Sequence, residues 1–208
     1  AEACPYEGGA LKWGFDAWRN CGGLSVELFF VLSGFLVSGL MFAEYRKRGE
    51  ISLKRFYLRR AWRIYPPFYA MIVFSYLFTW LALGERMLDS RIYSELFFLQ
   101  NYRQAYWNHT WTLALEEHFY IVLPLVLLAM ARLQRGASDP FRATPYLVAA
   151  SSALFLAVRI VNFTVRQEYS FHTPAWATHL RIDALFFGVG IAYVYHFHRE
   201  RFEGVVRP

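Results

Sequence analysis

One short stretch of the sequence carries the densest group of potentially reactive side chains. It holds two adjacent carboxylates, Glu116 and Glu117, followed by the imidazole of His118. A helix turns by about 100° per residue, so Thr112, Glu116 and Tyr120 would share one face while His118 points elsewhere. A carboxylate withdrawn from water is a stronger base and can take a proton from a hydroxyl, as general bases do in acyl transfer. We expect this role for Glu116; the alternative is a hydrogen-bonded structural glutamate.

A second group of charged side chains is a basic stripe. Arg55, Arg59 and Arg63 stand four residues apart, with Arg60 beside them, and Pro66–Pro67 follow. If the stretch is helical, these guanidinium groups share one side and could bind the phosphates of a cytoplasmic donor in a bidentate manner. The alternative is a basic loop that only sets membrane topology or binds anionic lipids. We expect the two prolines to mark the entry into an apolar span.

A third candidate is the carboxylate of Glu27, near the start of an apolar run. Helical spacing puts Val31, Gly34 and Ser38 on its face, a stripe of small residues suited to close contact between helices. Ionisable groups inside membrane spans are costly, so Glu27 is a functional candidate. The alternative is a packing face whose single carboxylate reaches the membrane surface.

Two further pairs have structural interpretations. Arg181 and Asp183 flank the start of a later apolar run, where we expect a structural ion pair or a charge at the helix N-terminus, with ligand contact as the alternative. Cys4 and Cys21 both precede the first apolar run and form either one disulfide or two free thiols. No spacing typical of a zinc site is present, so we expect no metal.

The composition shows which kind of protein must position these groups. Of 208 residues, 56% are hydrophobic, 20% aromatic and only 18% charged, with a net charge of +6. Soluble domains carry about a quarter charged residues, and disordered chains are far less apolar. The aromatic excess fits the interfacial belts of a membrane protein. We therefore expect an all-α, polytopic transmembrane bundle in a lipid bilayer, without a nucleic-acid partner.

A membrane-spanning helix needs about 20 predominantly apolar residues. By that measure the sequence contains about five candidate spans. The short run Leu96–Leu99 is better interpreted as an interfacial or re-entrant piece of the linker. The expected spans are 24–43, 67–83, 111–131, 143–161 and 182–197.

Basic residues indicate the orientation. The 44–66 connection carries eight lysines and arginines against two glutamates, so we expect it to be cytoplasmic. Alternation then places residues 1–23 outside as an extracytoplasmic segment. The membrane domain would cover 24–198, and the tail 199–208 would be cytoplasmic.

Several stretches together resemble the integral membrane acyltransferase family 3. The sequence LSVELFFVLSGFL resembles the signature of that family's second span, and RRAWRIYP resembles its cytoplasmic arginine motif. The sequence WTLALEEHFY is similar to a tryptophan–glutamate motif of the family, with Thr112 where serine is usual. RIDAL, which starts at Arg181, is a weaker fourth match. The four stretches follow one another in the family's order.

The resemblance implies transfer of an acyl group, most often acetyl, from cytoplasmic acyl-CoA to a hydroxyl of a cell-surface or secreted carbohydrate or related small molecule. It implies no bound cofactor, acyl-CoA as the donor substrate, and a multi-pass protein of the inner or plasma membrane. By position in the motifs, the expected catalytic residues are Glu116 and Glu27, and the expected substrate-binding residues are Arg59, Arg60, Arg63, Trp111 and Tyr120.

The sequence also departs from the family pattern. Members begin with an additional span that bears an arginine and a histidine central to the chemistry, and they have further spans after the fifth. We therefore expect a fragment that covers the second span onward. Two other functions stay open. One is a transporter or flippase for a glycan intermediate, with carboxylates coupled to protons; the other is an inactive truncated paralogue.

Overall fold

The computed structural model describes residues 10–84, 90–103, 105–166 and 177–206, which form helices joined by turns, without any strand in that part of the chain. This confirms the predicted all-α class. The elements are α1 (Ala10–Arg48), α2 (Leu53–Leu83), α3 (Ser90–Leu96), η1 (Asn108–Thr110), α4 (Trp111–Leu133), α5 (Thr144–Arg166), η2 (Thr178–Leu180), α6 (Asp183–Phe197) and α7 (Arg199–Val206).

Four of the described helices are long and apolar enough to cross a membrane. They correspond to the first four predicted spans and cover Leu24–Arg48, Leu53–Leu83, Asn108–Leu133 and Thr144–Asn162. The fifth predicted span is α6, an apolar helix of only 15 residues. Large apolar side chains such as Leu28 and Phe74 lie exposed on the outside of the bundle, as expected for a surface that faces lipid.

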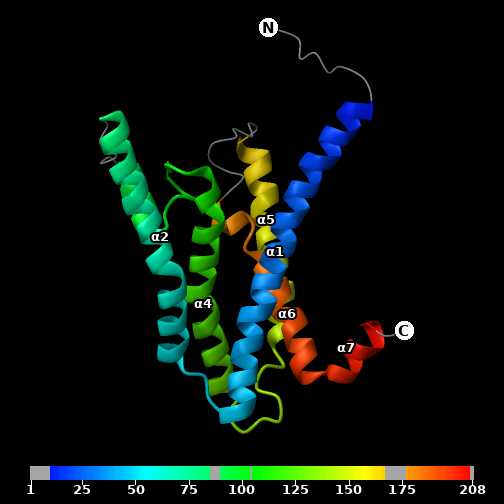
Figure 1. Ribbon diagram of the computed structural model, residues 1–208. Coiled ribbons are helices and arrows are strands. Elements are labelled where there is room, and N and C mark those ends of the chain that lie inside the picture. The colour runs from blue at the N-terminus through cyan, green and yellow to red at the C-terminus, as the bar shows by residue number, and fades with distance from the viewer. Residues whose placement is uncertain (1–9, 85–89, 104, 167–176, 207–208) are drawn as a thin grey trace.

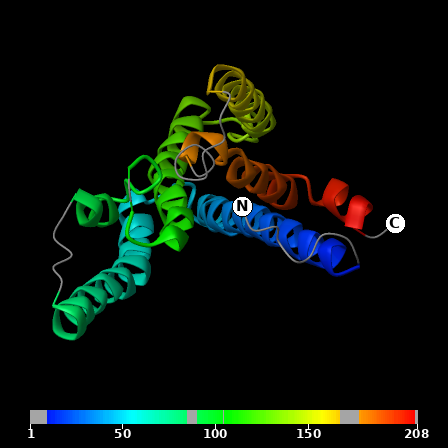
Figure 2. The ribbon, with the colours of Figure 1, turned by 90° about the horizontal axis from the view of Figure 1, so that it is seen from above.

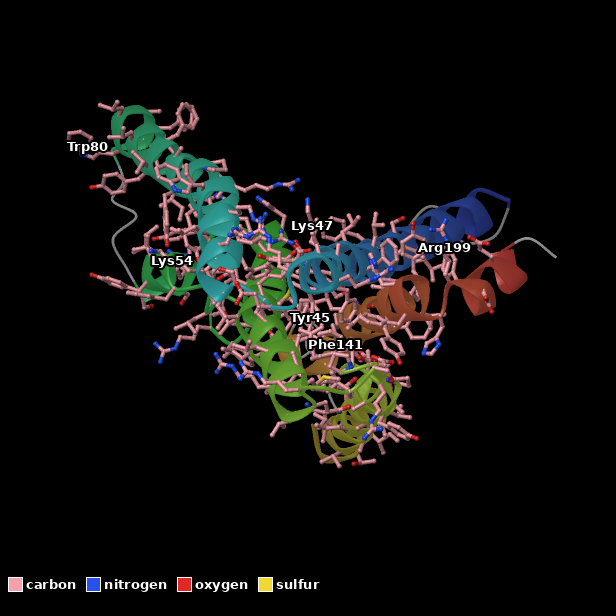
Figure 3. The ribbon with its side chains drawn as sticks, turned by 90° about the horizontal axis from the view of Figure 1, so that it is seen from below. Tyr45, Lys47, Lys54, Trp80, Phe141 and Arg199 are labelled. Atoms are coloured by element: carbon pink, nitrogen blue, oxygen red, sulfur yellow. The ribbon has the colours of Figure 1, made fainter. Side chains whose placement is uncertain are left out.

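The long helices alternate in direction. In Figure 1, α1 and α4 run downward and α2 and α5 run back upward, while α6 descends beside α1. Figure 2 shows from above that α1 and α6 lie side by side and that the C-terminal half of α2 diverges from the other helices. The turn at Gly49 joins α1 to α2 at the lower end, which we call the Gly49 end. Figure 3 views this end from below, with Lys47 at the end of α1 and Lys54 at the start of α2.

The contact between α1 and α6 depends on two glycines. A Cβ added to Gly34 would overlap the backbone carbonyl of Leu185, and one added to Gly188 would overlap that of Val31. Ser38 is fully buried and donates a hydrogen bond to the Gly34 carbonyl oxygen at 2.7 Å. The stripe of small residues on α1 is therefore a helix-packing face, as its spacing indicates.

The arginine stripe is helical, and the helix begins earlier than the expected span. α2 starts at Leu53 behind the N-cap Ser52, so most of the expected 44–66 connection belongs to α1 and α2. Pro66 and Pro67 lie inside α2 and do not mark its start. A proline's fixed φ is compatible with a helix, and in membrane proteins neighbouring groups satisfy the backbone carbonyls that it leaves without donors.

One other part of the chain differs from the expected segments. α1 begins at Ala10, so the second half of the expected extracytoplasmic segment 1–23 is a helix continuous with the first span. The disulfide suggested for Cys4 and Cys21 lies outside the described residues.

The linker between α2 and α4 contains the short helix α3. There Glu95 is fully buried, and its Oε1 accepts hydrogen bonds from the backbone N–H groups of Tyr106 and Trp107 at 3.2 and 3.3 Å. Its Oε2 has no hydrogen-bond partner among the described residues. Burial raises the pKa of this carboxyl above its ordinary value.

Candidate active site

A cavity of about 1000 Å³ opens between α1, α2 and α4. It brings together most of the residues that sequence analysis selected, although they come from two helices more than 50 positions apart. Among the side chains that line it are Arg59, Arg60, Arg63, Glu116 and Tyr120.

Helical periodicity explains how these side chains reach the cavity. On α2, Arg59 and Arg63 are one turn apart and Arg60 is adjacent, so the three guanidinium groups lie along one wall. On α4, Glu116 and Tyr120 are also one turn apart, and both line the same cavity. The shared face predicted for these two residues of α4 is therefore present.

Tyr120 is held from two sides. The Arg60 guanidinium lies 4.0 Å from the centroid of its ring, a cation–π contact. Its hydroxyl is 2.7 Å from Ser33 Oγ on α1. Sequence analysis missed Ser33, although this residue stands inside the motif quoted for the first span. The three residues connect α1, α2 and α4 at the cavity wall.

Glu116 is the most unusual group in the cavity. Its residue is 8% exposed, and within the described part of the chain its Oε1 has no hydrogen-bond partner. Burying a carboxylate oxygen without a partner is costly, and native proteins seldom retain such a group without a use for it. This state fits a group that completes its contacts only when a substrate is bound.

The neighbours of Glu116 on α4 face other surroundings. Glu117 is also buried, and its Oε2 accepts a hydrogen bond from the Tyr65 hydroxyl at 3.1 Å. His118 Nδ1 lies 2.9 Å from the hydroxyl of Thr178 in η2. Since His118 is engaged away from the cavity, it does not converge with Glu116, in agreement with the helical geometry.

A further carboxylate, Glu44 of α1, organises part of the arginine stripe. Its Oε1 is 2.8 Å from Arg55 Nη1, and its Oε2 is 3.8 Å from Arg59 Nη2. Glu44 also lines the cavity, and its side chain is 10% exposed. The four arginines are therefore not equivalent. Arg55 and Arg59 are paired with Glu44, while Arg60 packs on Tyr120.

The two remaining predicted site residues lie elsewhere. Glu27 Oε1 accepts a hydrogen bond from Arg181 Nη1 at 2.6 Å. Trp111 packs edge-on against Phe30 and lies under the Arg181 guanidinium, 5.5 Å from its ring centroid. Glu27 and Arg181 line a second hollow of about 440 Å³, separate from the arginine cavity. The structure thus divides the predicted site residues into two groups.

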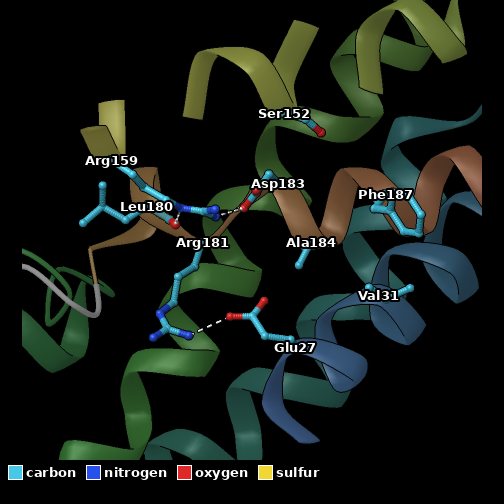
Figure 4. A pocket seen from close by; sticks show the side chains of 9 residues that line it. All are labelled: Glu27, Val31, Ser152, Arg159, Leu180, Arg181, Asp183, Ala184 and Phe187. Atoms are coloured by element: carbon cyan, nitrogen blue, oxygen red, sulfur yellow. Dashed lines mark hydrogen bonds and ion pairs between the residues drawn. The ribbon is translucent and has the colours of Figure 1, made fainter. Parts of the chain in front are cut away.

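The structural ion pairing and the N-terminal charge expected for Arg181 and Asp183 are present, with Asp183 in the first turn of α6. Both residues are ion-paired, but with partners on other helices. Arg181 is bound to Glu27 of α1, and Asp183 is 2.5 Å from Arg159 of α5. Figure 4 shows both pairs at the hollow. The residues sit at the junction of η2 and α6, where such cross-helix pairs tie three helices together.

These features define a class of protein. Long apolar helices enclose an arginine-lined cavity with a buried carboxylate, an arrangement compatible with a membrane-embedded enzyme. The chain belongs to the acyltransferase domain family, whose model matches residues 3–207. The described part of the chain shows no cluster of three or more side chains able to hold a metal ion.

Comparisons with known proteins agree with this family. The O-acetyltransferase OatA of Staphylococcus aureus is 26% identical over 194 residues, 86% of this chain and 31% of that protein. The peptidoglycan O-acetyltransferase OatA of Listeria monocytogenes is 28% identical over 132 residues, 56% of this chain and 21% of that protein. An uncharacterised protein of Haemophilus influenzae is 29% identical over 191 residues, 82% of this chain and 74% of that protein.

The chain spans less than a third of the length of the two OatA relatives. No solved structure matches it significantly.

Proposed function

We propose that the chain forms part of a membrane O-acyltransferase that moves an acyl group, in the first instance acetyl, from acyl-CoA to a hydroxyl of a cell-wall carbohydrate. The family and the names of the two OatA relatives support this class of reaction. The observation that carries the proposal is the arginine cavity, where Arg59, Arg60 and Arg63 line the same space as Glu116, whose buried Oε1 has no hydrogen-bond partner among the described residues.

The positive charge of the cavity supports a site for the donor. The phosphates of CoA are multivalent anions, and guanidinium groups bind phosphate oxygens through paired N–H donors. Arg60 and Arg63 are our principal candidates for these contacts, with Arg59 in support. The apolar side chains Leu36 and Leu40 also line the cavity and offer a surface for the uncharged part of the donor.

The transfer step needs a proton acceptor. The acceptor hydroxyl oxygen forms a new ester bond to the acyl carbon, and the thioester carbon–sulfur bond breaks. Glu116 takes the hydroxyl proton and passes it to the departing sulfur, so CoA leaves as the thiol. Tyr120 contributes a fixed hydroxyl beside this carboxylate, and Glu27 supports the acceptor side electrostatically with Trp111 nearby.

The orientation in the membrane is part of the proposal. Basic residues gather at the Gly49 end, where Arg46, Lys47 and Arg48 close α1. Such a bias marks the cytoplasmic side of the inner or plasma membrane, where acyl-CoA is available. Glu27 and Trp111 would then lie toward the outer side, where a cell-wall acceptor would enter.

The test is acetyl transfer by the full-length protein in membrane vesicles supplied with radiolabelled acetyl-CoA and soluble glycan. Glu116→Gln keeps the shape of the side chain but removes the base, so the rate should fall about 100-fold or more. The matched control Glu203→Gln changes an exposed glutamate of α7 and should leave the rate unchanged. Full transfer by Glu116→Gln would remove this residue from the mechanism.

A further inference from the structure

We propose that the second hollow, between α1, α5 and α6, is the binding site for an uncharged, polyhydroxylated stretch of the carbohydrate acceptor. This inference rests on the proposed O-acyl transfer and names the place where its acceptor is held. The hollow measures about 440 Å³, within the range of about 300–1,000 Å³ of small-molecule sites.

The hollow is built from three helices and the end of η2. Glu27 and Val31 come from α1, Ser152 and Arg159 come from α5, and the 180–187 stretch closes it. Figure 4 shows Arg181 extending to Glu27 on one side and Arg159 extending to Asp183 on the other. The polar groups therefore converge on the hollow from separate elements.

The charges of this hollow are balanced. Two arginines are each within 2.6 Å of a carboxylate oxygen, so every formal charge on its wall has an opposite partner. An anionic ligand would have to compete with Glu27 and Asp183 for the guanidinium groups. A neutral ligand can bind beside the pairs without separating them, so the charge pattern favours an uncharged molecule.

The hydrogen-bonding groups match the hydroxyls of a sugar. Arg159 uses Nε for the Leu180 carbonyl and Nη2 for Asp183, and a guanidinium carries five N–H donors, so donors remain. Glu27 and Asp183 each bring a second oxygen as acceptor, and Ser152 offers a hydroxyl. Sugar hydroxyls both donate and accept, so an alternation of donors and acceptors suits them better than it suits an apolar ligand.

The position of the hollow agrees with delivery of an acceptor. Val31 of α1 lines it, whereas the next two residues of the same turn, Leu32 and Ser33, line the arginine cavity. The two spaces thus lie on adjoining faces of one helical turn. A glycan anchored in the hollow would lie against the same helix that lines the cavity holding Glu116.

The test is direct binding of a soluble N-acetylglucosamine tetramer to the full-length protein in phosphatidylcholine nanodiscs, measured by calorimetry. Ser152→Phe fills part of the hollow while keeping all four ion-paired residues, and it should weaken binding at least tenfold. The matched control Ala153→Phe places the same ring on the exposed side of α5 and should not change the affinity. Equal affinity for wild type and Ser152→Phe, or an equal loss in both variants, would overturn the assignment.

A second variant covers the case in which Ser152→Phe does not fold. Asp183→Asn keeps the shape of its side chain but leaves the hollow with net positive charge, so sugar affinity should fall. Binding of phosphatidylglycerol should rise in this variant. A wild-type protein that binds phosphatidylglycerol at this hollow but not the tetramer would overturn the assignment in favour of an anionic lipid.

Transfer assays separate this inference from the proposed function. If the wild-type protein binds the tetramer in a Ser152-dependent way but transfers no acetyl, the binding site stands and the proposed reaction fails. If transfer is present and Ser152→Phe leaves the acceptor KM unchanged, the reaction stands and the site is wrong. A raised acceptor KM with an unchanged acetyl-CoA KM supports both.

Discussion

The two hollows that flank α1 handle charge in opposite ways. In the hollow at Arg181, two arginines and two carboxylates form two close ion pairs. The cavity at Arg60 is lined by three arginines and two glutamates. Among the described residues, Glu44 is the only one of these glutamates that forms an ion pair with one of the three arginines. Glu116 in that cavity keeps an oxygen without a hydrogen-bond partner in the same part of the chain.

This difference separates two uses of buried charge. Paired groups hold helices together and present fixed donors and acceptors, so they suit a neutral ligand. Groups left without partners are costly to keep and suit a ligand that supplies the missing contacts. This comparison supports the two proposals, which place the anionic donor and the proton transfer in the cavity of Arg60 and the neutral acceptor in the hollow of Arg181.

The largest effect is expected from a change that breaks both hollows at once. α1 is their common wall, and it contacts α6 through Gly188. In Gly188→Ala the new methyl group would overlap the backbone of α1, so the helices must separate. We expect a loss of about 3 kcal/mol or more in the free energy of unfolding.

Thermal unfolding of the purified protein measures this change. The matched control is Gly204→Ala in α7, where no atom lies within 4 Å of the added Cβ. If both alanine variants unfold at the wild-type temperature, the close crossing of α1 and α6 is not present in solution.

A second change tests whether the arginines of the cavity bind the donor. Arg63→Ala removes one guanidinium group, and a charge-assisted hydrogen bond contributes about 1.5–3 kcal/mol, so the KM for acetyl-CoA should rise about tenfold or more. The acceptor KM should not change. Arg135→Ala, an exposed arginine outside the cavity, is the control. An equal effect of both variants would show that the arginines act only through net charge.

A third change tests how Glu44 acts on the arginines. Glu44→Gln removes the negative charge next to Arg55 and Arg59 and frees both for an anionic donor. Exposed ion pairs contribute about 0.2–1 kcal/mol, so the KM for acetyl-CoA should fall about threefold. Steady-state kinetics measure this change. A raised KM would mean that Glu44 orients the arginines for binding and does not compete with the donor.

The smallest effect is expected in the pH dependence of stability. It comes from a carboxyl group that lines neither hollow. Burial raises the pKa of Glu95, so above the ordinary glutamate pKa the folded state binds more protons than the unfolded state. The free energy of unfolding should therefore fall as the pH rises through that window.

Glu95→Gln should remove this dependence, because an amide does not titrate. Unfolding midpoints at about pH 5 and about pH 8 measure it. A wild-type protein whose midpoint rises between these two values, with the variant unchanged, would contradict the burial of a carboxyl at this site.

The sequence was sufficient to predict what depends on local periodicity. Apolar runs located the first four spans, and the four-residue spacing of Arg59 and Arg63 placed both on one side of a helix. The stripe around Gly34 indicated a packing face. Each of these follows from the geometry of a single helix, so no knowledge of the tertiary arrangement was needed.

Contacts between distant segments were not predictable in the same way. Glu27 pairs with Arg181, which lies 154 residues away, and Asp183 pairs with Arg159 on a different helix. The separation of Trp111 from the arginine cavity has the same origin. Which arginine meets which carboxylate depends on how helices cross, and no local pattern encodes this.

The length of α6 has a consequence for the bilayer itself. Its 15 residues extend about 22 Å, whereas the hydrocarbon core of a membrane is about 30 Å thick. Lipids around a short apolar helix are compressed or replaced by water at its ends. Wherever lipid meets α6 along its length, the hydrocarbon layer should therefore be thinner than it is beside the four longer helices.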